Sequence, residues 1–374
     1  MRALRERTGG AVMFAGVGGR GMAAEGLQSL HPIEDFSIIG LSSIPQRLPR
    51  IVRHLRDTLH ALRRVRPDAL IVIDSPGYNL WLARFARRAN PSLPIFSYVS
   101  PSVWAWRPQR ARSMRRFIDH VLSLLPFEPA AHQRLGGPPC SYVGHPIIAE
   151  VAALRPDAVE ARRRLADPPV VLVLPGSRRG EVERLAAIFG NAVGLLRDRV
   201  GPLEVVVPTV PHLAPAVEAA TRSWPVAARI VVDPAEKHAA YRVARLALAK
   251  SGTVTLELAL AGVPMVAAYR LSTFDYAAGR MLVQVSSIIL ANLVLGENVV
   301  PEFIQGACTA ENLCDALVPL IGDTPERRRQ VEAFARLDQI MEIGAQAPAQ
   351  RAADVVLAGL PRRQVPFAGP AATL

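Results

Sequence analysis

The chain has 374 residues, half of them apolar, which is enough for two hydrophobic cores of ordinary domain size. Its 44 basic and 32 acidic residues give a charge of +12, which favours an anionic partner: a nucleic acid, an anionic lipid or a phosphorylated substrate. Three cysteines, an odd number without a CxxC motif, favour a reducing cytoplasm and no disulfide framework.

The positive charge is concentrated at one end of the chain. Residues 1–150 hold 20 arginines and 10 acids, whereas the remainder holds 24 bases and 22 acids. Only Lys237 and Lys250 are lysines. The longest uncharged runs, near 258–268 and 281–296, are too short or too polar for a bilayer span of about 20 apolar residues. We therefore expect contact with an anionic surface through the first half, without a membrane crossing.

Taken in chain order, a helical pattern over residues 1–8 is followed by short apolar runs that alternate with further helical patterns. In the first half the runs predict strands at Ala11–Ala15, Ala69–Ile73, Pro94–Val99, His120–Leu125 and Ser141–Val143. In the second half they predict strands at Val170–Leu174, Leu203–Val207, Arg229–Val232, Leu246–Ala249 and Pro264–Ala268. Continuous apolar runs are typical of parallel strands buried on both faces. The sequence thus predicts an α/β protein with two doubly wound parallel sheets.

We place the domain boundary at Gly144-His145-Pro146, which gives domains over 1–145 and 146–345. A C-terminal helix and a disordered tail are expected over 346–374. A doubly wound domain normally begins with a strand and a glycine-rich turn, but this chain begins with the helix that should follow them. We therefore expect the first strand of the N-terminal domain to be missing from this numbering, and the true start to lie upstream.

Two loops of the first half follow buried strands, where open α/β sheets bind ligands. The run Tyr98–Arg107 contains Trp104, Trp106 and two prolines, which make a stiff aromatic loop; simple loop packing is the alternative interpretation. Asp74 ends a strand and precedes a Pro-Gly turn. Its carboxylate is suited to act as a general base, although an aspartate there can also cap the next helix.

Two glycine-containing turns of the second half run from a strand into a helix. Backbone N–H groups and a helix N-terminus favour an anion there, and the guanidinium of Arg178 can donate two parallel hydrogen bonds to phosphate oxygens. Thr253 and Glu257 share a helical face, where a carboxylate can accept both hydroxyls of a ribose; a plain helix cap beside an incidental acid is the alternative. The predicted nucleotide site comprises Gly176, Ser177, Arg178, Ser251, Gly252, Thr253 and Glu257.

Other motifs carry weaker signals. Residues 16–21 match GxGxxG, which alone would suggest a dinucleotide site with Glu34 or Asp35 as the ribose acid. No Asp-x-Asp motif or His/Cys/Asp cluster has metal-ligand spacing, so we predict neither metal nor cofactor.

Apolar residues beside cations suit contact with a membrane interface. The predicted acceptor and membrane surface comprises Trp104, Trp106, Arg107, Ile38, Ile39 and Arg47.

Several of these motifs together resemble the signature of lipid-A-disaccharide synthases. Residues 98–107 carry the most specific match. The other matches, in the expected order, are residues 74–79, 124–128, 143–146, 174–178 and 251–253. The resemblance covers roughly residues 10–345. It implies a GT-B fold, in which two Rossmann-like domains face each other across a cleft.

The resemblance implies an inverting transfer of 2,3-diacylglucosamine from UDP to the 6-hydroxyl of 2,3-diacylglucosamine 1-phosphate. Both substrates are lipids, so a cytoplasmic enzyme peripheral to the inner membrane of a Gram-negative-type bacterium is expected, without a nucleic-acid partner. The first domain would bind the acceptor and the membrane, and the second would bind UDP. Asp74 would be the base, and Arg178 would hold the diphosphate. Asn292 matches a family asparagine, although Ala291 replaces the usual proline before it.

One departure from the family bears on activity. Family members begin with a strand and a Gly-Glu-Ala-Ser-Gly-Asp turn, neither of which is present here, so impaired activity is expected.

Two alternative functions are considered. One is another GT-B enzyme that uses UDP-N-acetylglucosamine, such as a peptidoglycan glycosyltransferase or an epimerase; the other is a non-catalytic protein that binds UDP or lipid. The Trp-Ala-Trp run argues against both alternative enzymes. The oligomeric state is left open.

Overall fold

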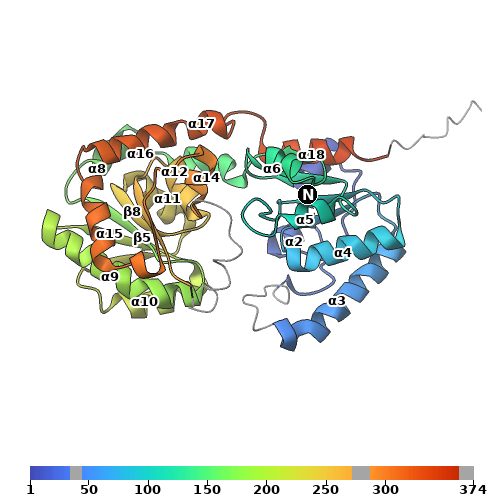
Figure 1. Ribbon diagram of the computed structural model, residues 1–374, viewed down its shortest axis with the longest axis horizontal. Coiled ribbons are helices and arrows are strands. Elements are labelled where there is room, and N and C mark those ends of the chain that lie inside the picture. Colours follow the sequence, from blue (N-terminus) through green and yellow to red (C-terminus); the bar gives the residue numbers. More distant parts are fainter. Residues whose placement is uncertain (34–43, 272–286, 362–374) are drawn as a thin grey trace, which may run out of the picture.

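A computed structural model describes residues 1–33, 44–271 and 287–361. Its two parallel sheets lie in two α/β lobes (Figure 1). The predicted membrane residues Ile38 and Ile39 and the predicted tail after residue 361 lie outside the described residues, and Arg47 is placed only as part of a helix. Among the described residues, no helix combines the length and the apolar character needed to cross a bilayer.

The first lobe contains a four-stranded parallel sheet in the order β1-β2-β3-β4. Its strands are β1 (Leu70–Ile73), β2 (Ile95–Tyr98), β3 (His120–Ser123) and β4 (Cys140–Tyr142). The helices of this part of the chain are α1 (Arg2–Arg7), α2 (Arg20–Ala24), α3 (Ile44–Val65), α4 (Pro76–Ala89), α5 (Gln109–Met114) and α6 (Glu128–Arg134). The apolar residues of α3 and α4 form one core layer with β1, β2 and β3.

The second lobe contains a six-stranded parallel sheet in the order β10-β9-β8-β5-β6-β7. Its strands are β5 (Val170–Leu174), β6 (Glu204–Pro208), β7 (Ala228–Val231), β8 (Leu246–Lys250), β9 (Met265–Tyr269) and β10 (Glu302–Ile304). Its helices are α7 (Val151–Leu154), α8 (Ala158–Arg164), α9 (Arg179–Val200), α10 (Ala214–Thr221), α11 (Pro234–Val243), α12 (Val254–Leu260), α14 (Leu290–Leu295), α15 (Ala310–Leu317), α16 (Pro325–Ala335) and α17 (Leu337–Ile340).

The central strand β5 shows why this lobe folds as it does. All five of its residues are buried, because helices cover both faces of the sheet. Val171 and Val173 pack with Phe189 of α9 on one face, and Leu172 packs with Leu256 of α12 on the other. A parallel sheet places the carboxyl ends of its strands at one edge, so the turns after β5 and β8 are brought to the same side.

The predicted strand at Ala11–Ala15 is wrong. No strand precedes β1 in residues 1–33 or 44–69, and this stretch contributes only one isolated bridge, between Gly16 and Ser29. Met13 is 98% exposed. An apolar run becomes a strand only where a neighbour receives its backbone hydrogen bonds; here Ala11 and Val12 instead bond locally, to the carbonyl oxygens of Thr8 and Gly10. β1 is consequently the outer strand of its sheet.

The last described helix, α18 (Pro348–Ala358), returns to the first lobe (Figure 1). Its Val356 packs with Phe96, Leu122 and Val143 on the sheet face opposite α3 and α4. α18 also lies against α1, where Arg7 pairs with Asp354 at 2.8 Å. The sequence alone left open whether the chain crosses back in this way.

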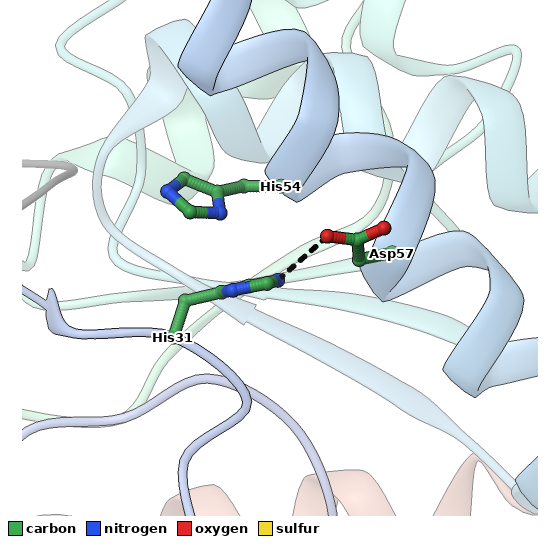
Figure 2. A group of neighbouring side chains, drawn as sticks. All are labelled: His31, His54 and Asp57. Atoms are coloured by element: carbon green, nitrogen blue, oxygen red, sulfur yellow. Dashed lines mark ion pairs between the residues drawn. The ribbon is translucent and has the colours of Figure 1, made fainter.

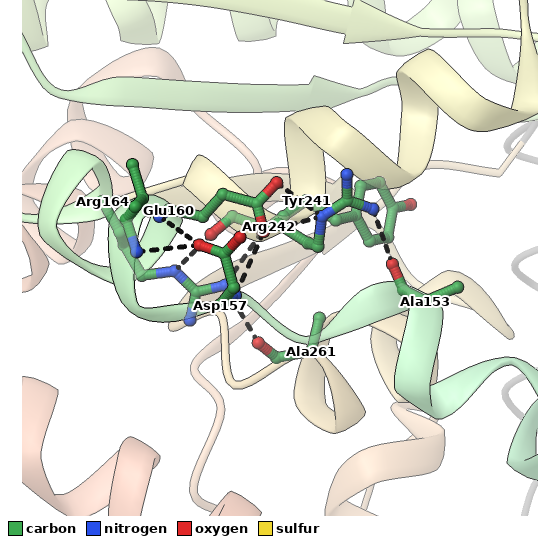
Figure 3. Close-up of polar contacts among 8 residues, drawn as sticks. Ala153, Asp157, Glu160, Arg164, Tyr241, Arg242 and Ala261 are labelled. Atoms are coloured by element: carbon green, nitrogen blue, oxygen red, sulfur yellow. Dashed lines mark hydrogen bonds and ion pairs between the residues drawn. The ribbon is translucent and has the colours of Figure 1, made fainter.

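Arg164 joins α8 to the ends of α11 and α12 (Figure 3). Its guanidinium donates to the carbonyl oxygens of Tyr241 at 3.0 Å, and of Arg242, Ala261 and Gly262 at 3.1 Å. They lie at helix ends, where carbonyl oxygens lack the usual intrahelical partner; of the four, Tyr241 also accepts the Ala244 N–H at 3.4 Å. Burial lowers the pKa of this guanidinium to about 10, so the group stays charged at neutral pH.

Replacement of Arg164 by methionine should destabilise the second lobe. The carbonyl oxygens of Arg242, Ala261 and Gly262 would lose their donor, and Tyr241 would keep only the Ala244 N–H. Each buried acceptor left unsatisfied costs about 1–3 kcal/mol, so we expect a loss of at least about 3 kcal/mol in urea unfolding. Arg162→Met, two residues earlier and exposed, is the control and should change stability by less than about 0.5 kcal/mol. Equal unfolding midpoints for the two variants would contradict this assignment.

Candidate active site

Asp74 occupies a strained turn at the carboxyl end of β1. Its φ of +50° and the φ of +42° at Ser75 lie in the left-handed region, which costs non-glycine residues about 1–2 kcal/mol each. The Asp74 N–H donates to the Tyr98 carbonyl oxygen at 3.0 Å, and the Asn79 amide donates to the carbonyl oxygens of Ile73 and Asp74 at 2.9 and 2.8 Å. The recess beside Asp74 is lined by Pro76, Asn79, Leu80, Ser97, Val99 and Pro101.

The Asp74 carboxylate is exposed and does not cap α4. The N-cap position of that helix is Ser75, and no side chain bonds the free N–H groups there. Among the described residues, the carboxylate oxygens accept no hydrogen bond and form no ion pair. The strain of the turn therefore presents an uncommitted carboxylate at the edge of the sheet, which is the geometry of a base rather than of a helix cap.

Trp104 anchors the loop that follows β2. Its indole N–H donates to Glu128 Oε1 at 3.0 Å, and its ring meets Phe127 edge-on at a centroid distance of 5.1 Å. Trp104 also packs against the core that runs through the second lobe. The buried Glu128 accepts the N–H groups of Leu124 and Leu125 as well, and burial raises the pKa of its carboxyl. Trp104 is thus engaged in packing between the lobes.

Trp106 lies between two arginines at the surface. The guanidinium carbons of Arg107 and Arg110 lie 4.8 and 5.1 Å from the centre of its ring. Arg107 is exposed, with φ of +54°, whereas burial lowers the pKa of Arg110, with a further contribution from the charge of Arg107. An aromatic ring with two attached cations suits an anionic, partly apolar partner.

The first turn of the second lobe is built over a buried carboxylate. Gly176 has φ of +132°, and a Cβ there would lie 2.5 Å from Glu181 Oε2, so only glycine fits. Glu181 Oε2 accepts the Ser177 N–H at 3.1 Å, while Oε1 accepts Arg178 Nη1 at 3.1 Å and lies 3.1 Å from Lys250 Nζ. The Glu181 side chain is 6% exposed and that of Arg178 is 56% exposed. Arg178, at the N-cap position of α9, therefore extends into solvent from a turn whose conformation is fixed.

The second turn leads from β8 into α12. Ser251 is buried, and its hydroxyl donates to Glu302 Oε1 at 3.1 Å, so it supports the turn from beneath. Gly252 and Thr253 lie at the surface of the turn, with Thr253 at the N-cap position but without a side-chain cap bond. Glu257, one helical turn later, pairs with Lys237 at 2.7 Å.

Asn292 of α14 is buried at 2% exposure. Its amide donates to the Val300 carbonyl oxygen at 3.0 Å, and its Oδ1 accepts the Val300 N–H at 2.9 Å. Glu302, which receives the Ser251 hydroxyl, also accepts from Ser287 at 3.1 Å, and burial raises its pKa. The structure thus gives Asn292 the geometry of a positioning residue. Its predicted contact with substrate stays a prediction.

Three residues of this region were not singled out from the sequence: Glu181, Lys250 and Lys237. The two lysines carry a signal that was visible there, because they are the only lysines among 44 basic residues. Both pair with carboxylates at the two turns. The structure thus brings together the first-lobe set around Asp74 and, separately, the second-lobe set of two turns. Among the described residues, no hydrogen bond or ion pair joins Asp74 to either turn.

Two α/β lobes, each built on a parallel sheet, define a GT-B glycosyltransferase fold. Solved structures agree at the level of the fold. Acinetobacter baumannii MurG superposes with a TM-score of 0.55 at 17% identity, covering 95% of this chain and 94% of that one. The calicheamicin glycosyltransferase CalG4 superposes with a TM-score of 0.57 at 17% identity, covering 97% and 94%.

The sequence comparison is more specific. The model of the family described as lipid-A-disaccharide synthetase matches residues 1–356. The lipid-A-disaccharide synthase of Rhodopseudomonas palustris (strain HaA2) is 56% identical over 357 residues, which cover 96% of this chain and 91% of that relative. The chain belongs to the lipid-A-disaccharide synthetase family, and it is a glycosyltransferase.

The burial of His132 leads us to expect that the stability of the protein decreases at acidic pH. The His132 ring is fully buried, its Nε2 lies 2.9 Å from Ser100 Oγ at the base of the Trp104 loop, and burial lowers its pKa to about 4. An unfolded histidine titrates near 6.5, so the unfolded state gains a proton first as the pH falls. Stability should therefore decline between pH 6.5 and 4.

Urea unfolding of the wild type and of His132→Gln at several pH values checks this. The variant should lose less stability than the wild type on going from pH 6.5 to 4, whatever its stability at neutral pH. His60→Gln, at an exposed position of α3, should keep the wild-type pH dependence. A His132→Gln curve parallel to that of the wild type would show that this imidazole does not cause the dependence.

Proposed function

We propose that the chain transfers 2,3-diacylglucosamine from UDP to 2,3-diacylglucosamine 1-phosphate and releases UDP. Family membership over residues 1–356 is the observation that carries this proposal. The two sets of site residues are consistent with it: an exposed carboxylate in the first lobe, and two glycine-containing turns with an exposed arginine, held by Glu181, in the second. On this assignment the first lobe binds the acceptor and the second binds the nucleotide.

Asp74 is the proposed base. Its carboxylate would accept the proton of the acceptor 6-hydroxyl as that oxygen attacks the anomeric carbon of the donor. The bond from this carbon to the UDP oxygen breaks, and attack from the opposite face inverts the centre. Asp74 is suited to this because it is exposed beside a recess, its own backbone makes two hydrogen bonds, and a third holds the carbonyl of the preceding Ile73. A base must lie within about 3 Å of the proton donor, which rigid support favours.

Arg178 would stabilise the charge that develops on the departing UDP. In the structure it donates to Glu181, which is also paired with Lys250. Lys250 keeps that buried carboxylate compensated when Arg178 turns towards a diphosphate. Gly176, Gly252 and Thr253 would supply backbone N–H groups at two helix N-termini, and Ser177, whose N–H donates to Glu181, would contribute its hydroxyl. Glu257, already paired with Lys237, would accept the ribose hydroxyls.

We further propose that the first lobe contacts the inner-membrane surface. Residues 1–150 carry most of the excess positive charge, and Trp106 with Arg107 and Arg110 offers an aromatic ring flanked by cations. Such groups favour the headgroup region of anionic lipids. Trp104 is committed to packing, so we assign contact with lipid to Trp106 and Arg107. Ile38, Ile39 and Arg47 remain part of this proposal.

The proposed role of Asp74 as the base can be tested in a transfer assay with UDP-diacylglucosamine and diacylglucosamine 1-phosphate in detergent micelles. Asp74→Asn should lower kcat by about 10²–10⁴-fold, because the acceptor hydroxyl loses its proton acceptor, while UDP affinity stays unchanged. Asp68→Asn, at the other end of β1, is the control and should keep wild-type turnover. If the wild type binds UDP but forms no disaccharide, the chain is a binding protein and the proposal is wrong.

Arg178 and its neighbour Arg179 allow a matched comparison. Arg178→Ala should lower kcat/KM by about 10²–10³-fold, the usual cost of removing one donor to a developing anion. Arg179 is 81% exposed and pairs with Glu183 four residues later, so Arg179→Ala should leave kcat/KM within about twofold. Equal losses in the two variants would indicate a general effect of charge instead of a specific contact with the diphosphate.

A further inference from the structure

A second cluster of reactive side chains lies in the first lobe, and none of its members lines the Asp74 recess. His31, His54 and Asp57 each present one possible ligand atom, and these atoms all lie within 4.8 Å of one another (Figure 2). The two imidazole rings have centroids 4.1 Å apart, and His31 Nε2 lies 3.8 Å from Asp57 Oδ2. We propose that these three side chains form a binding site for a divalent transition-metal ion of the Zn²⁺ type.

Two of the three side chains stand on a rigid support. His54 and Asp57 are three residues apart on α3, so they share one helical face. α3 is held through its apolar residues in the core, and Thr58 Oγ1 contacts both the His54 carbonyl oxygen at 2.7 Å and the Tyr78 hydroxyl at 3.1 Å. Positions fixed in this way favour a preorganised pair of ligands.

The third side chain comes from the loop after α2. Its backbone is fixed by Ser29, whose hydroxyl donates to the His31 carbonyl oxygen at 2.6 Å and accepts the Gly18 N–H at 3.0 Å. Figure 2 shows the His31 ring lying between the loop and α3, with its edge directed at Asp57. The sequence alone does not reveal this spacing, because only the fold brings residue 31 to α3.

The donor set selects the class of metal. Two imidazole nitrogens and one carboxylate suit Zn²⁺ and its neighbours, whereas Mg²⁺ and Ca²⁺ prefer oxygen ligands throughout. Metal–ligand bonds of about 2.0–2.2 Å in a tetrahedron place ligand atoms roughly 3.4 Å apart, so small side-chain rotations close the site. His54 is 8% exposed and the His31 side chain 13%, but the Asp57 side chain is 53% exposed. The open side gives the ion an entry path and leaves a position for water.

The positive charge around the cluster further favours a transition-metal ion over Mg²⁺ or Ca²⁺. α3 carries several arginines, among them Arg53 and Arg56, so long-range attraction does not bring cations to the site. Binding must come from direct bonds to nitrogen, which hard cations do not form well. A bound ion would fasten the loop that carries His31 to α3. Its role would be structural, and it would act independently of the proposed transfer reaction.

The experiment uses the full chain without a histidine tag, stripped of metal by a chelator that is then removed. Co²⁺ is titrated in, and its d–d absorption is followed as a report of nitrogen ligation; Zn²⁺ is then added in competition. Asp57→Asn and His31→Gln remove one ligand each with little change in size. His60→Gln is the matched control, since it removes an exposed histidine of α3 outside the cluster.

We expect one Co²⁺ per wild-type chain, displaced by one equivalent of Zn²⁺, and the same for His60→Gln. Asp57→Asn and His31→Gln should bind at least about tenfold more weakly. Zn²⁺ should raise the Tm of the wild type and the control but not that of the two ligand variants, whereas millimolar Mg²⁺ should leave all four unchanged. Absence of a stoichiometric d–d band, or equal binding by both ligand variants and the wild type, would overturn the proposal.

Discussion

A carboxylate enclosed beneath a backbone turn must be compensated, because taking an ionised group out of water costs on the order of several kcal/mol. Glu181 is in this situation under the Gly176 turn, and it is compensated by a backbone N–H, an arginine and a lysine. Ser177 and Arg178 belong to the turn after β5, and Lys250 is the last residue of β8, directly before the second turn. The same carboxylate therefore fixes the shape of one turn, ties it to the second, and holds Arg178 at the surface.

Much of the fold could be predicted because buried parallel strands leave a strong local pattern. The run Val170–Leu174 is a strand in the structure with the same bounds, since each of its residues is apolar and buried. Ala11–Ala15 has a similar composition but finds no partner for its backbone, and composition does not encode that. β10 was missed because a strand of three residues that begins with Glu302 carries no apolar run.

The candidate site was predicted in part for the same reason. Asp74 follows β1 directly and Arg178 lies in the short turn after β5, so their position in the sequence indicates their position in space. Glu181 was not recognised, because the need for a carboxylate beneath Gly176 arises only from the φ of that glycine. Asn292 was assigned to the active site through family resemblance, yet its side-chain amide forms hydrogen bonds with the backbone of Val300. A motif match locates such a residue but does not distinguish contact with substrate from support of the surrounding chain.

The return of α18 to the first lobe has a consequence for synthesis. Val356 completes a core layer with Phe96, Leu122 and Val143, which the ribosome makes far earlier. At about 5–20 residues per second, roughly two hundred intervening residues take some 10–40 s to emerge. During that interval one face of the first sheet lacks its covering helix and exposes apolar side chains. The nascent first lobe is thus a natural client for a chaperone until the second lobe has been translated.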